Sequence, residues 1–297
     1  MRVCIFLLTM LCTVMSISTL AADQVRLTIY TVNYPLHYFA QRIAGERAEV
    51  LFPVPSDLDP AFRQPAAEII AGYQQADLIL LNGARYAKWL DSVTLPRRKL
   101  VDTSAAFRDR YIRLDDAVTH SHGPAGDHSH GGIAFTTWLD FNQAVEQARA
   151  ISEALTRKRP EWKEEFMRNL GALETDLTEL DKQIRAIVAA RPNQPLMVSH
   201  PVYQYFQRHY GLDLKSVMWE ADEYPSEALW SEFERGLKEH PAQWMIWEGE
   251  PKPESVERLR SMGVESIVFN PAGNQPDQGD FLSVMRQNVK NLQQAFK

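Results

Sequence analysis

Short apolar runs alternate with amphipathic stretches in the first part of the chain, and they predict strands that alternate with helices. The run VRLTIYTV (25–32) is rich in β-branched residues, as buried strands are, and the helical pattern of LHYFAQRIAG (36–45) follows it. The same pairing recurs, and it predicts strands at 48–54 and 77–83 and helices at 65–76 and 84–93. Alternation of this kind implies right-handed crossovers and a parallel sheet covered by helices on both faces.

A much longer amphipathic stretch follows a predicted helix at 138–160. From residue 162 to residue 187 the apolar positions recur every three or four residues, which is the period of one helix face. These positions are Trp162, Phe166, Leu170, Leu173, Leu177, Leu180, Ile184 and Ile187. A helix of about 28 residues is roughly 42 Å long. We therefore expect a backbone helix that lies across two lobes.

A second alternating set fills the rest of the chain. It predicts strands at 194–200, 214–219, 242–248 and 264–271, which alternate with helices at 201–211, 226–240, 253–263 and 279–296. The two halves are similar in construction. The expected fold class is α/β, with two similar lobes whose parallel sheets are flanked by helices and which are joined by one long rigid helix.

The segment boundaries follow from these patterns. Residues 1–22 combine an early Arg2, a short apolar run and small residues up to Ala22, which is typical of a secretory signal peptide cleaved near Ala22. An N-terminal lobe is expected at 23–158, a linking helix at 159–191 and a C-terminal lobe at 192–297. We expect an exported protein, which suits a bacterial periplasm.

Composition narrows the chemistry. Both cysteines, Cys4 and Cys12, lie in the predicted signal peptide, so the mature chain has no disulfide partner and no thiolate for a metal. The formal net charge of the 297 residues is −6, and no basic stripe is present, which argues against nucleic acid and against anionic membranes as partners. A metal held by this protein must therefore use imidazole, carboxylate or water.

A histidine-rich segment at 115–132 interrupts the periodicity of the first lobe. It contains THSHGPAGDHSHGG, with His120, His122, His128 and His130, and its glycines and lack of apolar periodicity predict a long structureless insertion. Four imidazoles on such a loop suit Zn²⁺ or another divalent transition metal, such as Ni²⁺ or Cu²⁺. Because the loop must become ordered around the ion, we expect weaker binding there than in a rigid site.

The spacing of these histidines argues against an enzyme. In the compact HxHxDH pattern of metallo-hydrolases two residues separate the second histidine from the third, whereas five residues separate His122 from His128. No GxSxG, HExxH, P-loop or GxGxxG context is present either. We therefore expect a metal-binding protein that is not an enzyme.

Several stretches together resemble a known family, the periplasmic solute-binding proteins of zinc and manganese ABC transporters (ZnuA-like, cluster A-I). The matching stretches are YTVNYPLHYFAQRIAG, QADLILLNGARYAKWL, WLDFNQA, the long helix, VSHPVYQYFQRHYGL, WEADEYPS and IVFNP. Their order and spacing cover nearly the whole mature chain. The resemblance implies two α/β lobes with a metal in the cleft between them, delivery of the ion to a membrane permease, and a monomer.

The resemblance also implies where the family's metal ligands lie. The positions usually held by two histidines are occupied here by Ala61 and Thr136, and the usual aspartate position holds Asn270. Only His200, in VSHPVYQYF, matches. Zinc in a closed site takes about four nitrogen, oxygen or sulfur donors, so a single imidazole is not enough.

Other side chains are candidates to complete the cleft site. His37 begins a predicted helix at the C-terminal edge of the first sheet, and Glu248 ends a predicted strand in the second lobe, so our candidate set is His200, His37 and Glu248. Glu250 and Asp59 are further possibilities. The alternative is a periplasmic chaperone or scavenger, or a divergent relative, that binds metal mainly through the histidine loop.

Two further histidines lie on predicted helices of the second lobe. His209 is next to Arg208, and His240 is next to Glu239, on amphipathic helices. We interpret both as surface residues.

Overall fold

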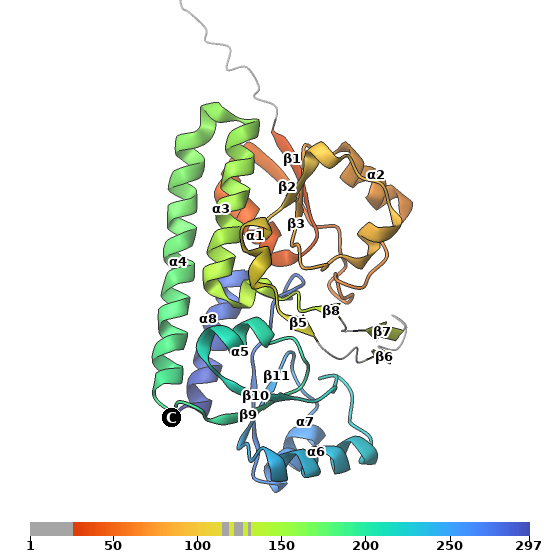
Figure 1. The fold of residues 1–297 in the computed structure, drawn as a ribbon, viewed down its shortest axis with the longest axis vertical. Helices are drawn as coiled ribbons and strands as arrows, with labels where there is room; N and C mark the ends of the chain where they lie inside the picture. The colour runs from red at the N-terminus through yellow and green to blue at the C-terminus, as the bar shows by residue number, and fades with distance from the viewer. Residues whose placement is uncertain (1–25, 115–118, 122–126, 130–131) are drawn as a thin grey trace, which may run out of the picture.

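The structure is a computed structural model that describes residues 26–114, 119–121, 127–129 and 132–297. It has two α/β lobes that lie along one long helix (Figure 1). This confirms the expected fold class. The predicted signal peptide lies outside the described residues. Within the described part of the chain, none of the helices combines the length and the apolar character that crossing a bilayer requires.

The first lobe holds a four-stranded parallel sheet with the order β2-β1-β3-β4. Its elements are β1 (Leu27–Thr31), α1 (Tyr34–Ala44), β2 (Ala48–Leu51), α2 (Ala67–Gln75), β3 (Leu78–Leu81), β4 (Leu100–Asp102) and α3 (Phe141–Lys158). Asn33 caps α1, because its side-chain oxygen accepts a hydrogen bond from the backbone N–H of Leu36, and the helix ends at Gly45 in a positive-φ conformation.

The second lobe repeats this arrangement. Its parallel sheet has the order β10-β9-β11-β12. The elements are β9 (Pro195–Val198), α5 (Gln204–Tyr210), β10 (Asp213–Ser216), α6 (Glu227–Glu239), β11 (Trp244–Trp247), α7 (Pro253–Ser261), β12 (Glu265–Val268) and α8 (Phe281–Ala295). In both sheets the chain crosses over its first strand to reach the third, so the switch point lies between those two strands.

The expected backbone helix is α4 (Lys163–Ala189), which passes both sheets (Figure 1). It packs against α3 in the first lobe and against α5 and α8 in the second. The predicted apolar stripe faces inward: Phe166, Leu173, Leu177 and Ile184 are fully buried. These side chains belong to one apolar core that continues from the first lobe into Phe206, Phe269 and Leu292 of the second. Packing therefore sets the orientation of the two lobes.

One expected element is wrong. The sequence pattern predicts a helix at 84–93, but only the 3-10 helix Lys88–Ser92 forms there. Gly83, Ala84 and Arg85 all have positive φ angles, of 73°, 47° and 54° respectively. This left-handed backbone cannot start an α-helix. A side chain at Gly83 would overlap the hydroxyl of Ser104, which explains why glycine begins this turn.

Short antiparallel pairs lie in the segment between β4 and α3. β5 (Arg113–Leu114) pairs with β8 (Gly132–Ile133), and β6 (Thr119–Ser121) pairs with β7 (Asp127–Ser129). The expectation of a structureless insertion at 115–132 therefore needs correction, because its described parts form backbone ladders.

Candidate metal centre

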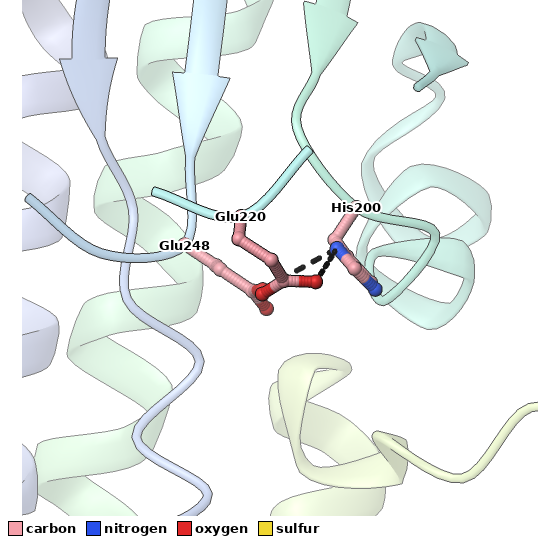
Figure 2. A group of neighbouring side chains, drawn as sticks. All are labelled: His200, Glu220 and Glu248. Atoms are coloured by element: carbon pink, nitrogen blue, oxygen red, sulfur yellow. Dashed lines mark ion pairs between the residues drawn. The ribbon is translucent and has the colours of Figure 1, made fainter. Parts of the chain in front are cut away.

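Three side chains meet at the C-terminal edge of the second sheet. His200 lies two residues after β9, Glu220 four residues after β10 and Glu248 directly after β11. Because β9 and β11 flank the switch point of this sheet, their ends open into the crevice where ligands collect in α/β folds. Figure 2 shows the two carboxylates pointing toward the imidazole.

Backbone pairing continues past the strands and holds these residues in register. The N–H of Ser199 donates to the carbonyl of Ile246, and the N–H of Trp219 donates to the carbonyl of Ser199. Trp219 and Trp247, which precede Glu220 and Glu248, are buried with Trp230 in the second apolar cluster of this lobe. Each glutamate thus directly follows a buried tryptophan in the chain, which limits the movement of its backbone.

The distances suit a single small cation. Nδ1 of His200 lies 3.7 Å from Oε1 of Glu220 and 3.5 Å from Oε1 of Glu248. The three ligand atoms all lie within 4.8 Å of one another, and this is the one such group of three found among the described residues. Two donors on a tetrahedral ion with bonds of about 2.1 Å are roughly 3.4 Å apart. Small side-chain movements would therefore bring all three onto one ion.

The electrostatics of the group favour a cation. Burial raises the pKa of Glu248 to about 8, and the negative charges of Glu220 and Asp59 add to the effect. Burial also raises the pKa of Glu220 to about 7, with contributions from Asp222, Glu223 and Asp59. The raised pKa values mean that the ionised carboxylates are unfavourable in this position. A divalent ion bound between them would remove most of their mutual repulsion.

The group lies in a cleft of about 950 Å³ whose walls come from both lobes. Thr136, Trp138 and the loop around Asp59 line it from the first lobe, opposite the glutamates. Its carboxylates are Asp57, Asp59, Glu220, Asp222, Glu223, Glu248, Glu250 and Asp277. No lysine or arginine is found among the described residues that line it. The cleft therefore attracts cations and repels anions.

The positions at which the family resemblance implies ligands have other roles. The Thr136 hydroxyl donates to the carbonyl of Val202, which ties the first lobe to the segment after His200. The side-chain oxygen of Asn270 accepts a hydrogen bond from the N–H of Ala272. Ala61 is fully buried. Thr136 and Asn270 line the cleft, but their oxygens are engaged in these hydrogen bonds, so His200 is the one implied position with an ionisable side chain.

His37 is placed away from this group. It lies in α1, where its ring stacks against Tyr34 and also contacts Phe52, and it is not among the residues that line the cleft. Burial lowers its pKa to about 4. The expectation that His37 shares a site with His200 therefore needs correction: aromatic packing holds His37 inside the first lobe. Glu248 lies where expected, and Glu250 lines the cleft but lies outside the ligand group.

The loop histidines are only partly described. His120 and His128 lie directly opposite each other in the β6–β7 ladder. His122 and His130 lie outside the described residues. The backbone register therefore brings two of the four predicted loop positions together in one ladder.

Two residues of importance were missed or misjudged from the sequence. Glu220 was not a candidate, although it directly follows the predicted strand at 214–219, and the rule that ligands collect at strand ends applies to it as well as to Glu248. His209 was interpreted as a surface residue, but only 8% of its side chain is exposed. His240 is half-buried, and its ring contacts the carbonyl of Leu196.

Sequence comparison identifies relatives over nearly the whole chain. Residues 29–295 match the family described as zinc-uptake complex component A, periplasmic. The zinc-binding lipoprotein AdcA of Streptococcus pneumoniae (strain R6) is 25% identical over 282 residues, which cover 91% of this chain and 56% of AdcA. The chain thus spans about half the length of the first curated relatives it matches. The high-affinity zinc uptake system protein ZnuA of Bacillus subtilis (strain 168) is 24% identical, with 91% and 88% coverage.

Solved structures show the same fold. The metal-dependent lipoprotein YcdH from Bacillus subtilis superposes with a TM-score of 0.76 at 21% identity, and the match covers 91% of this chain and 99% of that one. The Zn(II)-bound ZnuA-like domain of Streptococcus pneumoniae AdcA gives a TM-score of 0.76 at 22% identity, with 92% and 99% coverage. These comparisons confirm the resemblance noted in the sequence.

Proposed function

This chain belongs to the family of periplasmic zinc-uptake complex component A, and from this premise we propose that it is a receptor that binds Zn²⁺ in the cleft between its lobes. His200, Glu220 and Glu248 hold the ion. The observation that carries the proposal is the convergence of these three side chains from adjacent strand ends within 4.8 Å of one another.

The donor set suits zinc as a transported ion. Imidazole nitrogen and carboxylate oxygen are both ordinary zinc ligands, and three protein donors leave at least one position for water or another group. Asp59 lies across the cleft on the wall of the first lobe, and its charge is sensed by both glutamates. We propose that this charge draws the cation into the cleft. A site with one open position releases its ion more readily than a closed four-ligand cage.

The remaining parts of the proposal concern the setting of the protein. We propose that residues 1–22 are a signal peptide cleaved near Ala22 and that the mature chain works as a monomer in the periplasm. It delivers its ion to the permease of an ABC transporter and acts as a binding receptor rather than an enzyme. His120, His122, His128 and His130 form a second, weaker zinc-gathering site on the loop.

Zinc titration of the mature chain and of His200→Ala tests the cleft site. Competition against a chromogenic chelator at pH 7.5 measures the affinity, and calorimetry measures the number of ions bound. We expect one tight site per chain in the wild type and its loss in H200A, because an imidazole donor is replaced by a methyl group. The matched control is His240→Ala, which removes a half-buried histidine of the same lobe outside the cleft.

The scavenger alternative predicts a different pattern. If the loop were the main site, binding would be weak, more than one ion would bind per chain, and H200A would behave like the wild type. Unchanged affinity in H200A together with loss of binding on deletion of the loop would therefore replace the cleft receptor by a scavenger.

A further inference from the structure

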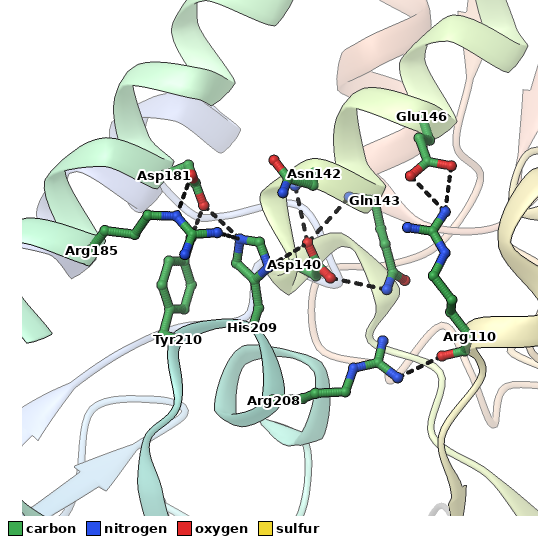
Figure 3. A network of polar contacts seen from close by, with 10 residues as sticks. All are labelled: Arg110, Asp140, Asn142, Gln143, Glu146, Asp181, Arg185, Arg208, His209 and Tyr210. Carbon is green, nitrogen blue, oxygen red and sulfur yellow. Dashed lines mark hydrogen bonds and ion pairs between the residues drawn. The ribbon is translucent and has the colours of Figure 1, made fainter. Parts of the chain in front are cut away.

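A buried histidine outside the cleft contacts two carboxylates from different parts of the fold. Nδ1 of His209 lies 3.1 Å from Oδ1 of Asp140, and its Nε2 lies 2.6 Å from Oδ1 of Asp181 (Figure 3). The exposed fraction of the side chain is 8% for His209, 9% for Asp140 and 12% for Asp181. The ring is thus clamped between two carboxylates that are largely shielded from water.

A ring that carries protons on both nitrogens satisfies both of these contacts at once. A neutral imidazole has one N–H, so one of the two contacts would then set a nitrogen lone pair against a carboxylate oxygen. Asp181 stays ionised: burial alone would raise its pKa, but hydrogen bonds from His209 and Arg185 hold it at about 2. The short contact to Asp181 therefore requires a proton on Nε2.

The surrounding charges are balanced by the charged ring. Arg185 places Nη2 2.9 Å from Nε2 of His209, a like-charge contact, but its Nε donates to Oδ2 of Asp181 at 2.8 Å. Arg185 thus offsets Asp181, and the charged His209 offsets Asp140. Without the charge on His209, one buried carboxylate would lack a counter-ion, which is costly in a low-dielectric interior.

Other polar groups around the ring belong to the same three helices and to the segment before β5. Tyr210 donates its hydroxyl proton to Oδ1 of Asp181. Arg208 donates to the carbonyl of Arg110, and Arg110 pairs with Glu146 of α3. The phenol of Tyr205 donates to the carbonyl of Ala134. Each of these groups thus has a partner other than the ring, and among the described residues Asp140 and Asp181 are the carboxylates in direct contact with it.

The three helices that meet here belong to different parts of the molecule. Asp140 is the N-cap of α3 in the first lobe and accepts hydrogen bonds from the N–H groups of Asn142 and Gln143. Asp181 lies on the backbone helix α4, and His209 lies on α5 of the second lobe. α5 begins four residues after the metal ligand His200, so what fixes α5 also fixes the segment that carries the ligand.

We infer that His209, in its doubly protonated form, is a charged bridge that locks the second lobe against the first and thereby positions His200 for the metal. The link to His200 rests on the proposed function, whereas the bridge itself does not. His209 is a positioning residue, because it acts on the site through α5 and does not touch the ion. A ring with a single N–H could donate to only one of the two carboxylates.

Inter-lobe distances measured by pulsed electron paramagnetic resonance test the bridge. Because both cysteines precede Ala22, spin labels at Glu68→Cys on α2 and Glu234→Cys on α6 are unique in the mature chain. We expect one narrow distance distribution in the wild type. We expect a broad distribution in His209→Gln, whereas the control His240→Gln behaves like the wild type.

A second variant guards against a folding defect. Asp140→Asn keeps the helix cap, because asparagine caps as well as aspartate, but removes the charge that His209 faces. D140N is expected to broaden the distribution as H209Q does. A packing role alone would leave the distribution of D140N narrow, and narrow distributions in both D140N and H209Q would overturn the bridge.

Zinc affinity, measured on the same proteins by chelator competition, tests the link to His200. We expect the zinc affinity of H209Q to fall about tenfold with unchanged stoichiometry. A loss of this size corresponds to a lobe orientation competent for binding that is populated about one tenth of the time. Broad distances with wild-type affinity would overturn the positioning role. If the wild type bound no zinc in the cleft, the proposed function would fail, while the distances would still decide the bridge.

Discussion

Glu248 and His200 follow neighbouring parallel strands, and Oε1 of Glu248 lies 3.5 Å from Nδ1 of His200. The pair spans the switch point of the second sheet. In the first lobe the corresponding position holds two neutral amides, since the side-chain NH₂ of Asn33 donates to the side-chain oxygen of Asn82. The two similar sheets thus differ in the chemistry of their switch points, since an imidazole and a carboxylate lie at the second where two amides lie at the first.

Replacing Glu248 by glutamine should weaken zinc binding by more than about 100-fold. Loss of groups that merely support a ligand costs 10–100-fold, and loss of the ligand itself costs more. Chelator competition at pH 7.5 measures the change. The matched control is Glu250→Gln, a carboxylate of the same cleft outside the ligand group. Equal losses in E248Q and E250Q would indicate diffuse attraction by the cleft instead of ligation.

Zinc binding should release protons and weaken as the pH falls from 8 to 6. With pKa values of about 8 for Glu248 and about 7 for Glu220, the two carboxyls together hold between one and two protons at pH 7, and zinc must displace them. Calorimetry in two buffers of different ionisation enthalpy counts the released protons. E248Q should release about one proton fewer than the wild type. Proton release that is independent of both glutamates would contradict this assignment.

The order of elements was largely predictable, because burial on one face imposes a local period on the sequence. The stripe through Phe166, Leu173 and Ile184 predicted the long helix, and all three side chains are buried. The strand β4 was not predicted. It has three residues, Leu100–Asp102, and so short a run carries no periodicity. The turn at Gly83 was misjudged because apolar spacing does not report the sign of φ.

The candidate site was less predictable, since it depends on which strand ends become neighbours. The motif around His200 pointed to one member of the group, and the strand pattern pointed to Glu248. Glu220 joins them only because β10 pairs with β9, a relationship of sheet order that no local pattern expresses. His209 was misjudged for a similar reason: its carboxylate partners lie 69 and 28 residues away along the chain, as the pairs with Asp140 and Asp181 show.

The metal-free protein should become less stable as the pH rises from 6.5 to 8.5. The folded pKa values of Glu220 and Glu248 lie above the ordinary value of 4.5, so the folded state holds more protons than the unfolded state in this window, and raising the pH favours unfolding. The slope is at most about 1.4 kcal/mol per pH unit for each carboxyl. His37, whose pKa is lowered to about 4, acts in the opposite direction below this window.

Urea unfolding in the presence of a chelator measures this slope. The double variant E220Q/E248Q should flatten it, because neither amide titrates. Excess zinc should reverse the trend, since the ion binds the deprotonated carboxylates of the folded state. A wild-type slope that persists in the double variant would assign the effect to other groups.

Deleting residues 119–132 should remove the additional, weaker zinc ions and leave the cleft site intact. The proposed cleft ligands lie in the second lobe, far along the chain from the loop, whereas His120 and His128 are opposed positions of the β6–β7 ladder. The loop ions should be lost in mild acid, because binding requires neutral imidazole. Calorimetric titration at pH 7.5 and pH 6 compares the two proteins.

His120→Ala combined with His128→Ala is the finer variant, and it should remove part of the additional binding without shortening the chain. Identical stoichiometry and heats in the full-length and deleted proteins would exclude the loop as a zinc site, and loss of the tight site on deletion would mean that the loop supplies a cleft ligand.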